Sequence, residues 1–250
     1  MKTTNKILLT AFVLILLASL AMMGYIRSQV SPEMFHCVEG SGQVLEQERL
    51  LENFNGLHLR GNMNVYLYPG TDAFLRIEAD DNLHDLITSD HRDGILSLTL
   101  EQQVSRHAKL DIHIGFHQID EIHVSAGGKV FTKAPIYATF LSHVVQTGAQ
   151  STLHLYVDEL DLKVQAGATA NLEGEAESMI LISQAGAMVY ASDLRVSVCE
   201  IMARAGSVNM LYVTESISGR ARQGAILQLK GNPDQRGFSS QQGVSIEILD

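Results

Sequence analysis

The sequence is poor in basic charge, in cysteine and in biased segments. Its 250 residues contain 18 Lys and Arg against 28 Asp and Glu, a formal net charge of −10. Proteins that bind nucleic acid or anionic membrane surfaces do so through basic patches, so this balance argues against both partners, and we expect no nucleic-acid ligand. No tract of low complexity is present and 46% of the residues are hydrophobic, which predicts a folded chain beyond the N-terminus.

Common enzyme motifs are also missing. The chain has no Gly-x-Ser-x-Gly, no Walker loop, no Gly-x-Gly-x-x-Gly before a helix and no Cys-x-x-Cys pair. We therefore predict that it is not an enzyme, with no catalytic residues, no cofactor and no metal. Of its two cysteines, Cys199 falls in an apolar position and is expected to be buried and inert. A disulfide between Cys37 and Cys199 is the less favoured alternative, because burial and distance both oppose it.

What the sequence does contain is a repeat. A small residue followed by glycine returns at intervals of 21, 19, 19, 20, 18 and 19 residues, and a fixed period of this size is typical of stacked units. The central glycines of the repeats are Gly127, Gly148, Gly167, Gly186, Gly206, Gly224 and Gly243.

Aligning the repeats on these glycines shows alternating columns. The positions five and three residues before the glycine are mostly apolar or small, as at Leu162 and Val164, and the position two before is polar. Alternation with a period of two predicts a β-strand with one face inward and the other outward. Leucines a few residues after the glycine, such as Leu153 and Leu172, indicate a second strand or a continuation round a corner.

Nineteen residues are too few for a strand–helix–strand crossover with its loops. We therefore predict an all-β fold, a right-handed parallel β-helix (β-solenoid) in which successive turns stack at about 4.8 Å. The competing interpretation is an antiparallel sandwich, which also has short, evenly spaced strands. The solenoid is favoured because a sandwich does not require the same residue type at the same place in every repeat.

The chain begins with a different kind of segment. Lys2 and Lys6 precede an apolar run over residues 7–23, which predicts an export signal or a membrane anchor over residues 1–29. Cleavage after Ala21 and retention of an anchor ending at Arg27 both remain open. Either one predicts an exported protein of the periplasm, the outer surface or the envelope membrane.

Residues 30–250 are predicted to form one domain, with a cap and first coils over 38–120 and regular repeats over 121–250. Residues 40–120 alternate in several bursts, with one short helix expected near Asp80–Ile87 and a tight turn at Asp93-Gly94. Because a solenoid must cover its open ends, this β-rich part is expected to act as the N-terminal cap.

Several segments in this order resemble the bacterial head GIN domain family of auto-transporter adhesins. They are residues 40–44, 46–49, 54–57, 78–83 and 93–96, followed by the glycine repeats and Gly231-Asn232-Pro233. The resemblance runs from about residue 38 to the C-terminus. It implies an exported β-helical domain and transfers no catalytic residues. Auto-transporters end in a membrane barrel, whereas this sequence ends directly after its last repeat, so we expect that it does not translocate itself.

The polar column is the predicted binding site. An outward stripe of amides and guanidinium groups could bind the hydroxyls or carboxylates of an extended ligand. The alternative, which we favour, is a structural ladder of side-chain amides hydrogen-bonded up the stack. The predicted binding residues are Gln146, Gln165, Gln184, Arg204 and Arg222, with Gln241 at the end of the same column.

Two further clusters are judged structural. Asp111, His113 and His117 share one face of a strand, but ligands four residues apart along a strand are about 13 Å apart, too far to share one ion. The acidic residues of the repeats are expected to be solvated charges, mostly at turns, rather than a catalytic acid and base. These acidic residues are Asp158, Glu159, Asp161, Glu173, Glu175 and Glu177.

Three classes of function remain open. The preferred one is an exported, non-catalytic adhesion or binding module for a glycan or an envelope protein. The second is an envelope scaffold, which could form a homo-oligomer through an exposed solenoid edge. The third is a polysaccharide-active enzyme, which a convergent pair of carboxylates in an elongated groove would favour.

Overall fold

The computed structural model describes residues 12–24, 37–70, 72–105, 107–241 and 243–249. The chain divides into two units, Met1–Cys37 and Val38–Asp250. In the first unit, residues 12–24 form a helix. The predicted signal or anchor also depends on Lys2, Lys6 and Arg27, which lie outside the described residues. Among the described residues, no helix combines the length and the apolar character needed to cross a membrane.

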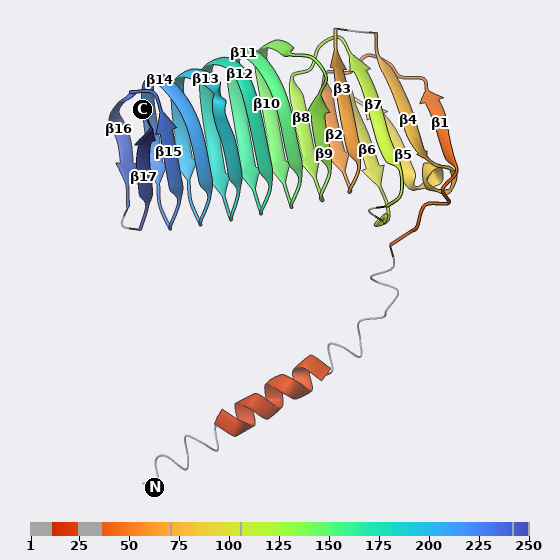
Figure 1. The fold of residues 1–250 in the computed structure, drawn as a ribbon, viewed down its shortest axis with the longest axis horizontal. Helices are drawn as coiled ribbons and strands as arrows, with labels where there is room; N and C mark the ends of the chain where they lie inside the picture. Colours follow the sequence, from red (N-terminus) through yellow and green to blue (C-terminus); the bar gives the residue numbers. More distant parts are fainter. Residues whose placement is uncertain (1–11, 25–36, 71, 106, 242, 250) are drawn as a thin grey trace. The chain divides into compact units, whose positions relative to one another are not determined.

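The second unit is a stack of coils of β-strand (Figure 1). Its centre consists of five long strands, each paired in parallel with the next along the chain. This arrangement confirms the predicted parallel β-solenoid and excludes the antiparallel sandwich. The five strands are β10 (Ile136–Gln146), β11 (Gln150–Gln165), β12 (Thr169–Gln184), β13 (Met188–Ala203) and β14 (Val208–Ala221).

Each long strand bends near its middle. In β11 the buried positions alternate up to Val157, two exposed residues follow at Asp158 and Glu159, and the alternation resumes with Leu160 buried. The extra exposed residue shifts the alternation by one position at the bend. Without this shift, the apolar side chains after the bend would point outward. Leu153 pairs with Leu172 on the first half of the rung, so the predicted continuation round a corner is confirmed.

The repeat glycines form the tight turns at the other edge. Ala166 and Gly167 both have positive φ, 55° and 71°, and the N–H of Ala168 donates to the carbonyl of Gln165 at 3.3 Å. Two central residues of positive φ closed by this bond define a type I′ turn, which explains the small residue and the glycine. The turns also stack, because the Gly167 N–H donates to the carbonyl of Ala185 in the next coil at 3.0 Å.

The coils before residue 136 do not stack in chain order. The coil of β2 and β3 is inserted between two later coils: β2 pairs in parallel with β6 and β8, and β3 with β7 and β9. In Figure 1 these orange strands lie among yellow-green ones. The strands are β2 (Gly56–Arg60), β3 (Asn64–Pro69), β6 (Ile95–Leu100), β7 (Leu110–Phe116), β8 (Glu121–Ser125) and β9 (Lys129–Thr132).

Antiparallel strands close this end of the stack. β4 (Phe74–Asp80) pairs with β7 and with β1 (Val44–Arg49), and β5 (Ile87–Arg92) pairs with β6. Antiparallel pairing changes the hydrogen-bond pattern at the edge and ends the parallel stack, as expected of a cap. The turn between β5 and β6 is at Asp93-Gly94, with φ of 51° and 77°, as predicted.

The predicted short helix is present. It is a 3-10 helix, η2 (Asp81–Leu86), and Asp80 occupies the N-cap position without a side-chain cap bond. The Asp80 carboxylate instead accepts the backbone N–H of Lys109 at 3.0 Å. Asp80 therefore holds the end of β4 against Lys109, the residue before β7, and does not cap the helix.

At the other end of the stack, the final two strands pair with β14 and with β15 (Ile226–Lys230). β16 (Asp234–Ser240) pairs with β14, and β17 (Ser245–Leu249) pairs with β15. All five residues of β17 are exposed. Parallel pairing thus continues to the last described coil.

The interior consists of the apolar columns that the repeat alignment predicted. His143, Leu162, Leu181 and Ile201 are in register across β10 to β13, and all are buried. Cys199 is buried as expected, and burial raises the pKa of its thiol to about 12, which makes it inert. Cys37 is exposed and is not joined to Cys199 in a disulfide.

Candidate functional site

The predicted polar column forms a hydrogen-bonded ladder. The Gln165 amide nitrogen donates to Gln146 Oε1 at 2.6 Å, and the Gln184 amide nitrogen donates to Gln165 Oε1 at 2.8 Å. Arg204 Nε donates to Gln184 Oε1 at 2.7 Å. At the other end, Gln146 Nε2 lies 2.9 Å from His123 Nε2. Side chains on five successive coils are therefore linked. Gln146, Gln165 and Gln184 are in register on consecutive coils, whereas His123 is in register with Val144, two residues before Gln146.

The ladder has a direction that Arg204 sets. A guanidinium group only donates hydrogen bonds, so the Gln184 atom that faces it must be the oxygen. Each glutamine then turns its nitrogen toward the preceding coil, and Gln146 presents an N–H to His123. His123 Nε2 must accept this bond, which requires a neutral imidazole with its proton on Nδ1. Burial, followed by the nearby imidazole of His58, lowers the pKa of His123, in agreement with a neutral ring.

The ladder uses much of the hydrogen-bonding capacity of the column. Gln146, Gln165, Gln184 and Arg204 are half-buried, and their polar groups bond to one another along the column. Arg222 lies one coil further on, in a hollow of about 310 Å³ with Arg220 and Gln241. The binding role of the column stays a prediction.

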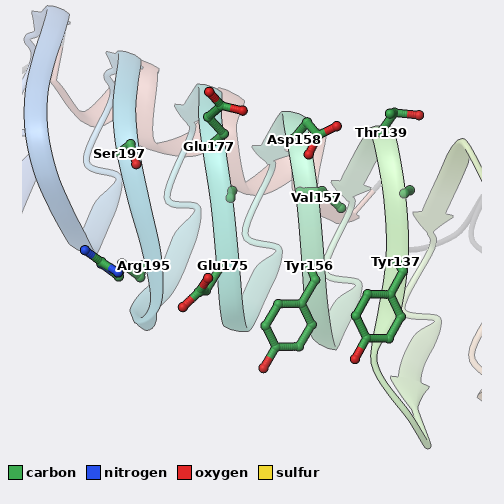
Figure 2. A pocket seen from close by; sticks show the side chains of 11 residues that line it. Tyr137, Thr139, Tyr156, Val157, Asp158, Glu175, Glu177, Arg195 and Ser197 are labelled. Carbon is green, nitrogen blue, oxygen red and sulfur yellow. The ribbon is translucent and has the colours of Figure 1, made fainter.

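A groove on the outside of the central coils is the strongest candidate site. It has a volume of about 670 Å³ and crosses β10 to β13 where the long strands bend. One margin carries Tyr137, Tyr156, Glu175 and Arg195, which are in register on consecutive coils. Figure 2 shows these four side chains in one line and those of Thr139, Asp158, Glu177 and Ser197 in a second line opposite. We call this feature the tyrosine groove.

The two tyrosines form an exposed aromatic platform. Their rings are stacked, with centroids 5.2 Å apart and planes inclined by 10°, and Tyr137 is 72% and Tyr156 37% exposed. His154 lies against Tyr156, with ring centroids 5.2 Å apart. Between the margins, the buried residues Val157 and Ala176 belong to the floor. A stacked, solvent-facing pair of large rings beside an apolar floor is suited to pack against an apolar ligand face.

Among the described residues, the charged groups of the groove take part in no ion pair. Glu175 and Arg195 are neighbours in register, yet no ion pair among the described residues includes either of them. Asp158 and Glu177 are likewise exposed and outside every described ion pair. Three carboxylates and one guanidinium are thus available to accept and donate bonds to a ligand, with a net negative charge.

This geometry corrects the expectation that the acidic residues of the repeats sit mostly at turns. Asp158, Glu159 and Asp161 lie inside β11, and Glu173, Glu175 and Glu177 lie inside β12. The strands are sixteen residues long because they continue through the bend, which the sequence pattern showed only as a break in alternation.

The tyrosines and Arg195 were missed in the sequence, although a signal for them exists. Tyr137, Tyr156, Glu175 and Arg195 each stand eleven residues before a repeat glycine, and the opposite margin stands nine before. Columns of like residues are the ones that stand out when the repeats are aligned. This column mixes aromatic, acidic and basic types, so it did not stand out.

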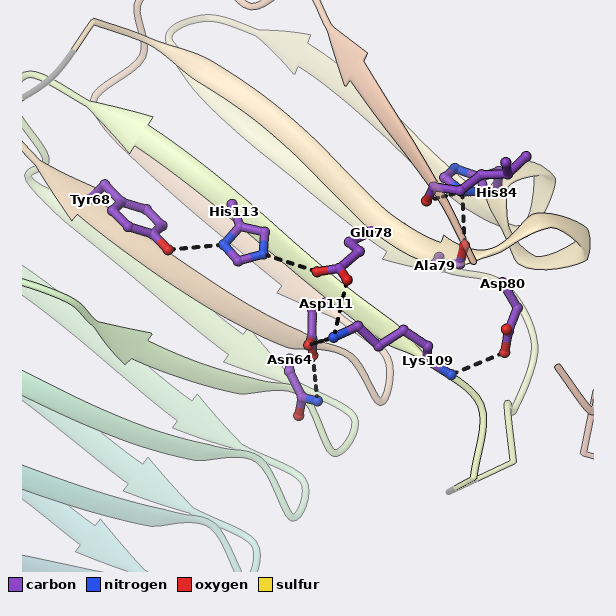
Figure 3. A network of polar contacts seen from close by, with 10 residues as sticks. Asn64, Tyr68, Glu78, Ala79, Asp80, His84, Lys109, Asp111 and His113 are labelled. Atoms are coloured by element: carbon purple, nitrogen blue, oxygen red, sulfur yellow. Dashed lines mark hydrogen bonds and ion pairs between the residues drawn. The ribbon is translucent and has the colours of Figure 1, made fainter. Parts of the chain in front are cut away.

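A polar network covers the outside of β3, β4 and β7 (Figure 3). Lys109 Nζ lies 2.8 Å from Asp111 and 3.4 Å from Glu78, and the Asn64 amide donates to Asp111 at 3.0 Å. Burial acts to raise the pKa of Asp111, but the hydrogen bonds from Lys109 and Asn64 outweigh it and lower the pKa. The carboxylates of this cluster are engaged in holding the cap strands together.

The histidines of the same region are placed as structural groups. His113 Nδ1 lies 3.0 Å from the Tyr68 hydroxyl, and its ring stacks on Tyr66 with centroids 5.3 Å apart. Burial, followed by the charge of Arg76, lowers the pKa of His113. His117 is exposed beyond the end of β7. In the described part of the chain, no three His, Cys, Asp or Glu side chains are grouped to hold a metal ion.

Comparison with known proteins identifies the family. Residues 53–233 match the model of the family described as "Putative auto-transporter adhesin, head GIN domain", and the chain belongs to that family. This confirms the resemblance inferred from the sequence segments. The chain matches none of the curated proteins with which it was compared.

Solved structures show the same fold. A putative adhesin from Bacteroides fragilis is 21% identical, with a TM-score of 0.79, and the match covers 85% of this chain and 100% of that one. A putative lipid binding protein from Parabacteroides distasonis is 12% identical, with a TM-score of 0.67 and coverage of 86% and 100%. At these identities the likeness concerns the fold alone.

Proposed function

We propose that the chain is an exported, non-catalytic binding module of the cell envelope that holds an extended glycan in the tyrosine groove. The observation that carries this proposal is the platform of Tyr137 and Tyr156, stacked and exposed. In line with it stand Glu175 and Arg195, which take part in no ion pair among the described residues. A sugar ring offers an apolar face to an aromatic ring and hydroxyl groups to carboxylates and guanidinium groups. Membership of an adhesin family agrees with a binding role.

The spacing of the groove supports a glycan over a peptide. Side chains repeat along the groove at the coil spacing of about 4.8 Å, which is close to the length of one sugar residue in an extended chain. An extended peptide presents side chains on one face every second residue, about 6.7 Å apart, and would lose register within a few coils. A glycan lying along the stack can therefore place one sugar residue on each coil.

Direct binding to defined oligosaccharides tests this proposal. The purified full chain is titrated with neutral, acidic and amino oligosaccharides, and the best ligand is measured against Tyr137→Ala with Tyr156→Ala. We expect the double variant to bind at least tenfold more weakly, because the platform is removed. The matched control is Tyr190→Ala, since Tyr190 is 36% exposed and lies outside the groove. Equal weakening by the control, or unchanged binding by the double variant, would contradict the groove.

The polar column provides a second arm of the same experiment. Arg204→Gln with Arg222→Gln removes the two cations of the predicted binding column. If the ligand depends on these guanidinium groups, the double variant weakens binding at least tenfold and flattens its salt dependence. If it depends on the tyrosine groove, the arginine variant binds like the parent. The two candidate surfaces are thereby separated.

The envelope location is part of the proposal. It is supported by the basic start and apolar run at the N-terminus and by the adhesin family. Cell fractionation with N-terminal sequencing tests it. We expect the folded unit in the envelope, either cut after Ala21 or retaining its first residues. Intact chain recovered only from the cytoplasm would contradict export.

A polysaccharide-cleaving enzyme is the second candidate, and one observation favours it. Asp158, Glu175 and Glu177 bring three carboxylates to the same elongated groove. Glycoside hydrolysis needs two carboxyl groups on either side of the bond that is cut. Prolonged incubation of the bound oligosaccharide, followed by measurement of new reducing ends, separates this candidate from binding alone. Cleavage that disappears in Glu177→Gln would establish it.

A further inference from the structure

A second hollow lies over the outer face of β6, β2 and β8, away from the tyrosine groove. It has a volume of about 450 Å³. Two neighbouring rows of outward side chains line it. Ser97, His58 and His123 are in register in one row, and Thr99, Arg60 and Ser125 are in register in the next. The inserted coil of β2 and β3 makes this arrangement possible, because it brings His58 and Arg60 between residues that follow them in the chain.

The hollow is basic, although the chain is acidic overall. Arg60 is exposed and, among the described residues, its guanidinium group has no ion pair and no side-chain hydrogen bond. No Asp or Glu is among the described residues that line the hollow. The adjacent carboxylate, Glu121, is engaged with His58 Nε2 at 2.6 Å. With a formal net charge of −10 on the chain, a hollow whose one permanent charge is positive is suited to an anion.

Hydroxyl groups line the hollow together with Arg60. Thr99 and Ser125 flank Arg60 on the two neighbouring strands, and Thr147 lines the hollow from the turn after β10. The Ser125 hydroxyl donates to the carbonyl of Leu59 at 3.2 Å and keeps its lone pairs. The other two hydroxyls can each donate one bond. A planar group with two parallel N–H donors, flanked by hydroxyl donors, matches the oxygens of a carboxylate, phosphate or sulfate.

We propose that this hollow is a second binding site, which takes an oxyanion group through Arg60 with Thr99 and Thr147. It differs from the tyrosine groove in position and in charge, since the groove carries three carboxylates and one guanidinium. The two sites select different chemical groups. The oxyanion can be a free anion or an acidic group carried on a glycan, and both present the same oxygens to Arg60.

The test is a titration of the full chain observed by NMR. The imidazole signals of His58 and His123 serve as reporters, because both rings line the hollow. One arm uses inorganic phosphate and the other a uronic acid disaccharide. We expect both imidazole signals to shift in a saturable manner. Saturation by phosphate with no tighter binding of the disaccharide assigns a site for free anions. Tighter binding of the disaccharide assigns the acidic group of a glycan.

Variants decide whether Arg60 forms the site. Arg60→Gln is expected to weaken anion binding at least tenfold, and Arg60→Lys to retain part of it, because the charge remains but the paired N–H donors are lost. The matched control is Arg92→Gln, an exposed arginine of β5 paired with Asp90. Equal binding by Arg60→Gln and the parent, equal weakening by Arg92→Gln, or no saturable shift in either arm would overturn the proposal. Tyr137→Ala should leave this titration unchanged, so the two sites can fail independently.

Discussion

Arg204 Nε donates a hydrogen bond to Gln184 Oε1 at 2.7 Å, and this contact orients every amide in the ladder below it. An isolated glutamine can present either its oxygen or its nitrogen to a neighbour. In this stack Arg204, which can only donate, fixes the orientation of Gln184, and the orientation of the other glutamines follows from it. The result reaches His123, four coils away, as the requirement for a neutral ring that accepts from Gln146.

Reversing the donor should therefore reverse the ladder. In Arg204→Glu the new carboxylate can only accept, so Gln184 must turn its nitrogen toward it, and Gln165 and Gln146 must follow. Gln146 then presents its oxygen to His123, which becomes a donor, and the pKa of His123 rises from its lowered value. The measurement is the nitrogen NMR spectrum of the imidazole, which distinguishes the two neutral forms.

Arg204→Lys is the control for this experiment, because an ammonium group also only donates. It should keep the proton of His123 on Nδ1. The ladder would not be directional in the sense described if both variants left the His123 spectrum unchanged, or if both changed it in the same way.

Two classes of glycine should differ in their response to a side chain. At Gly174 a Cβ would lie 2.0 Å from the carbonyl oxygen of Leu155 in the preceding coil, and φ is 112°. At Gly167, in the repeated turn, φ is 71° and no atom lies within 4 Å of the added carbon. We expect Gly174→Ala to cost about 3 kcal/mol or more of unfolding free energy and Gly167→Ala about 1 kcal/mol. Denaturant unfolding of both variants measures the difference, and a larger loss at Gly167 would contradict this reasoning.

The regular part of the fold could be predicted from the sequence because each coil repeats the same physical requirement. Leu162, Leu181 and Ile201 occupy the same interior position, so the columns that align in the sequence are the pairs found in the structure. The type I′ turn requires positive φ twice, and that need is visible as a small residue followed by glycine.

The inserted coil and the groove could not be predicted in the same way. β2 pairs with β6 and β8, whose residues are distant from it in the chain. The local alternation of residues 56–60 predicts a strand but does not indicate which strands are its neighbours. The tyrosine groove depends on the bend after Val157, where two successive residues face outward. A repeat alignment detects shared residue types, whereas this site is made by different types at one position.

The interior register can be tested at Leu162. Leu162→Asp places a carboxylate in a fully buried column between His143 and Leu181, with no partner for its charge. We expect a loss of about 4 kcal/mol or more of unfolding free energy. The control is Ile180→Asp on the next coil, where the side chain is 51% exposed and a charge remains hydrated. Thermal unfolding that shows similar melting temperatures for Leu162→Asp and the parent would place Leu162 outside the core.

His143 should make the stability of the fold depend on pH. The ring is fully buried, its Nδ1 lies 2.9 Å from the carbonyl of Ile122, and its Nε2 has no hydrogen-bond partner within the described structure. Burial lowers the pKa of His143 to about 4, against an ordinary value of 6.5. The folded ring is therefore neutral over a pH range in which the unfolded ring takes up a proton.

The sign of the effect follows from this difference. Above pH 6.5 the ring is neutral in both the folded and the unfolded state, so His143 does not lower the free energy of unfolding. As the pH falls from 6.5 to about 4, the ring becomes protonated in the unfolded state but stays neutral in the folded state. The free energy of unfolding therefore falls by up to 1.4 kcal/mol per pH unit, about 3 kcal/mol in total. Below about 4 the loss levels off.

His143→Leu removes the titrating group and continues the leucine column with Leu162. We expect this variant to lose less stability than the parent between pH 6.5 and 4 in urea unfolding, because the other histidines titrate equally in both proteins. An identical pH dependence in parent and variant would show that His143 is not the buried group responsible.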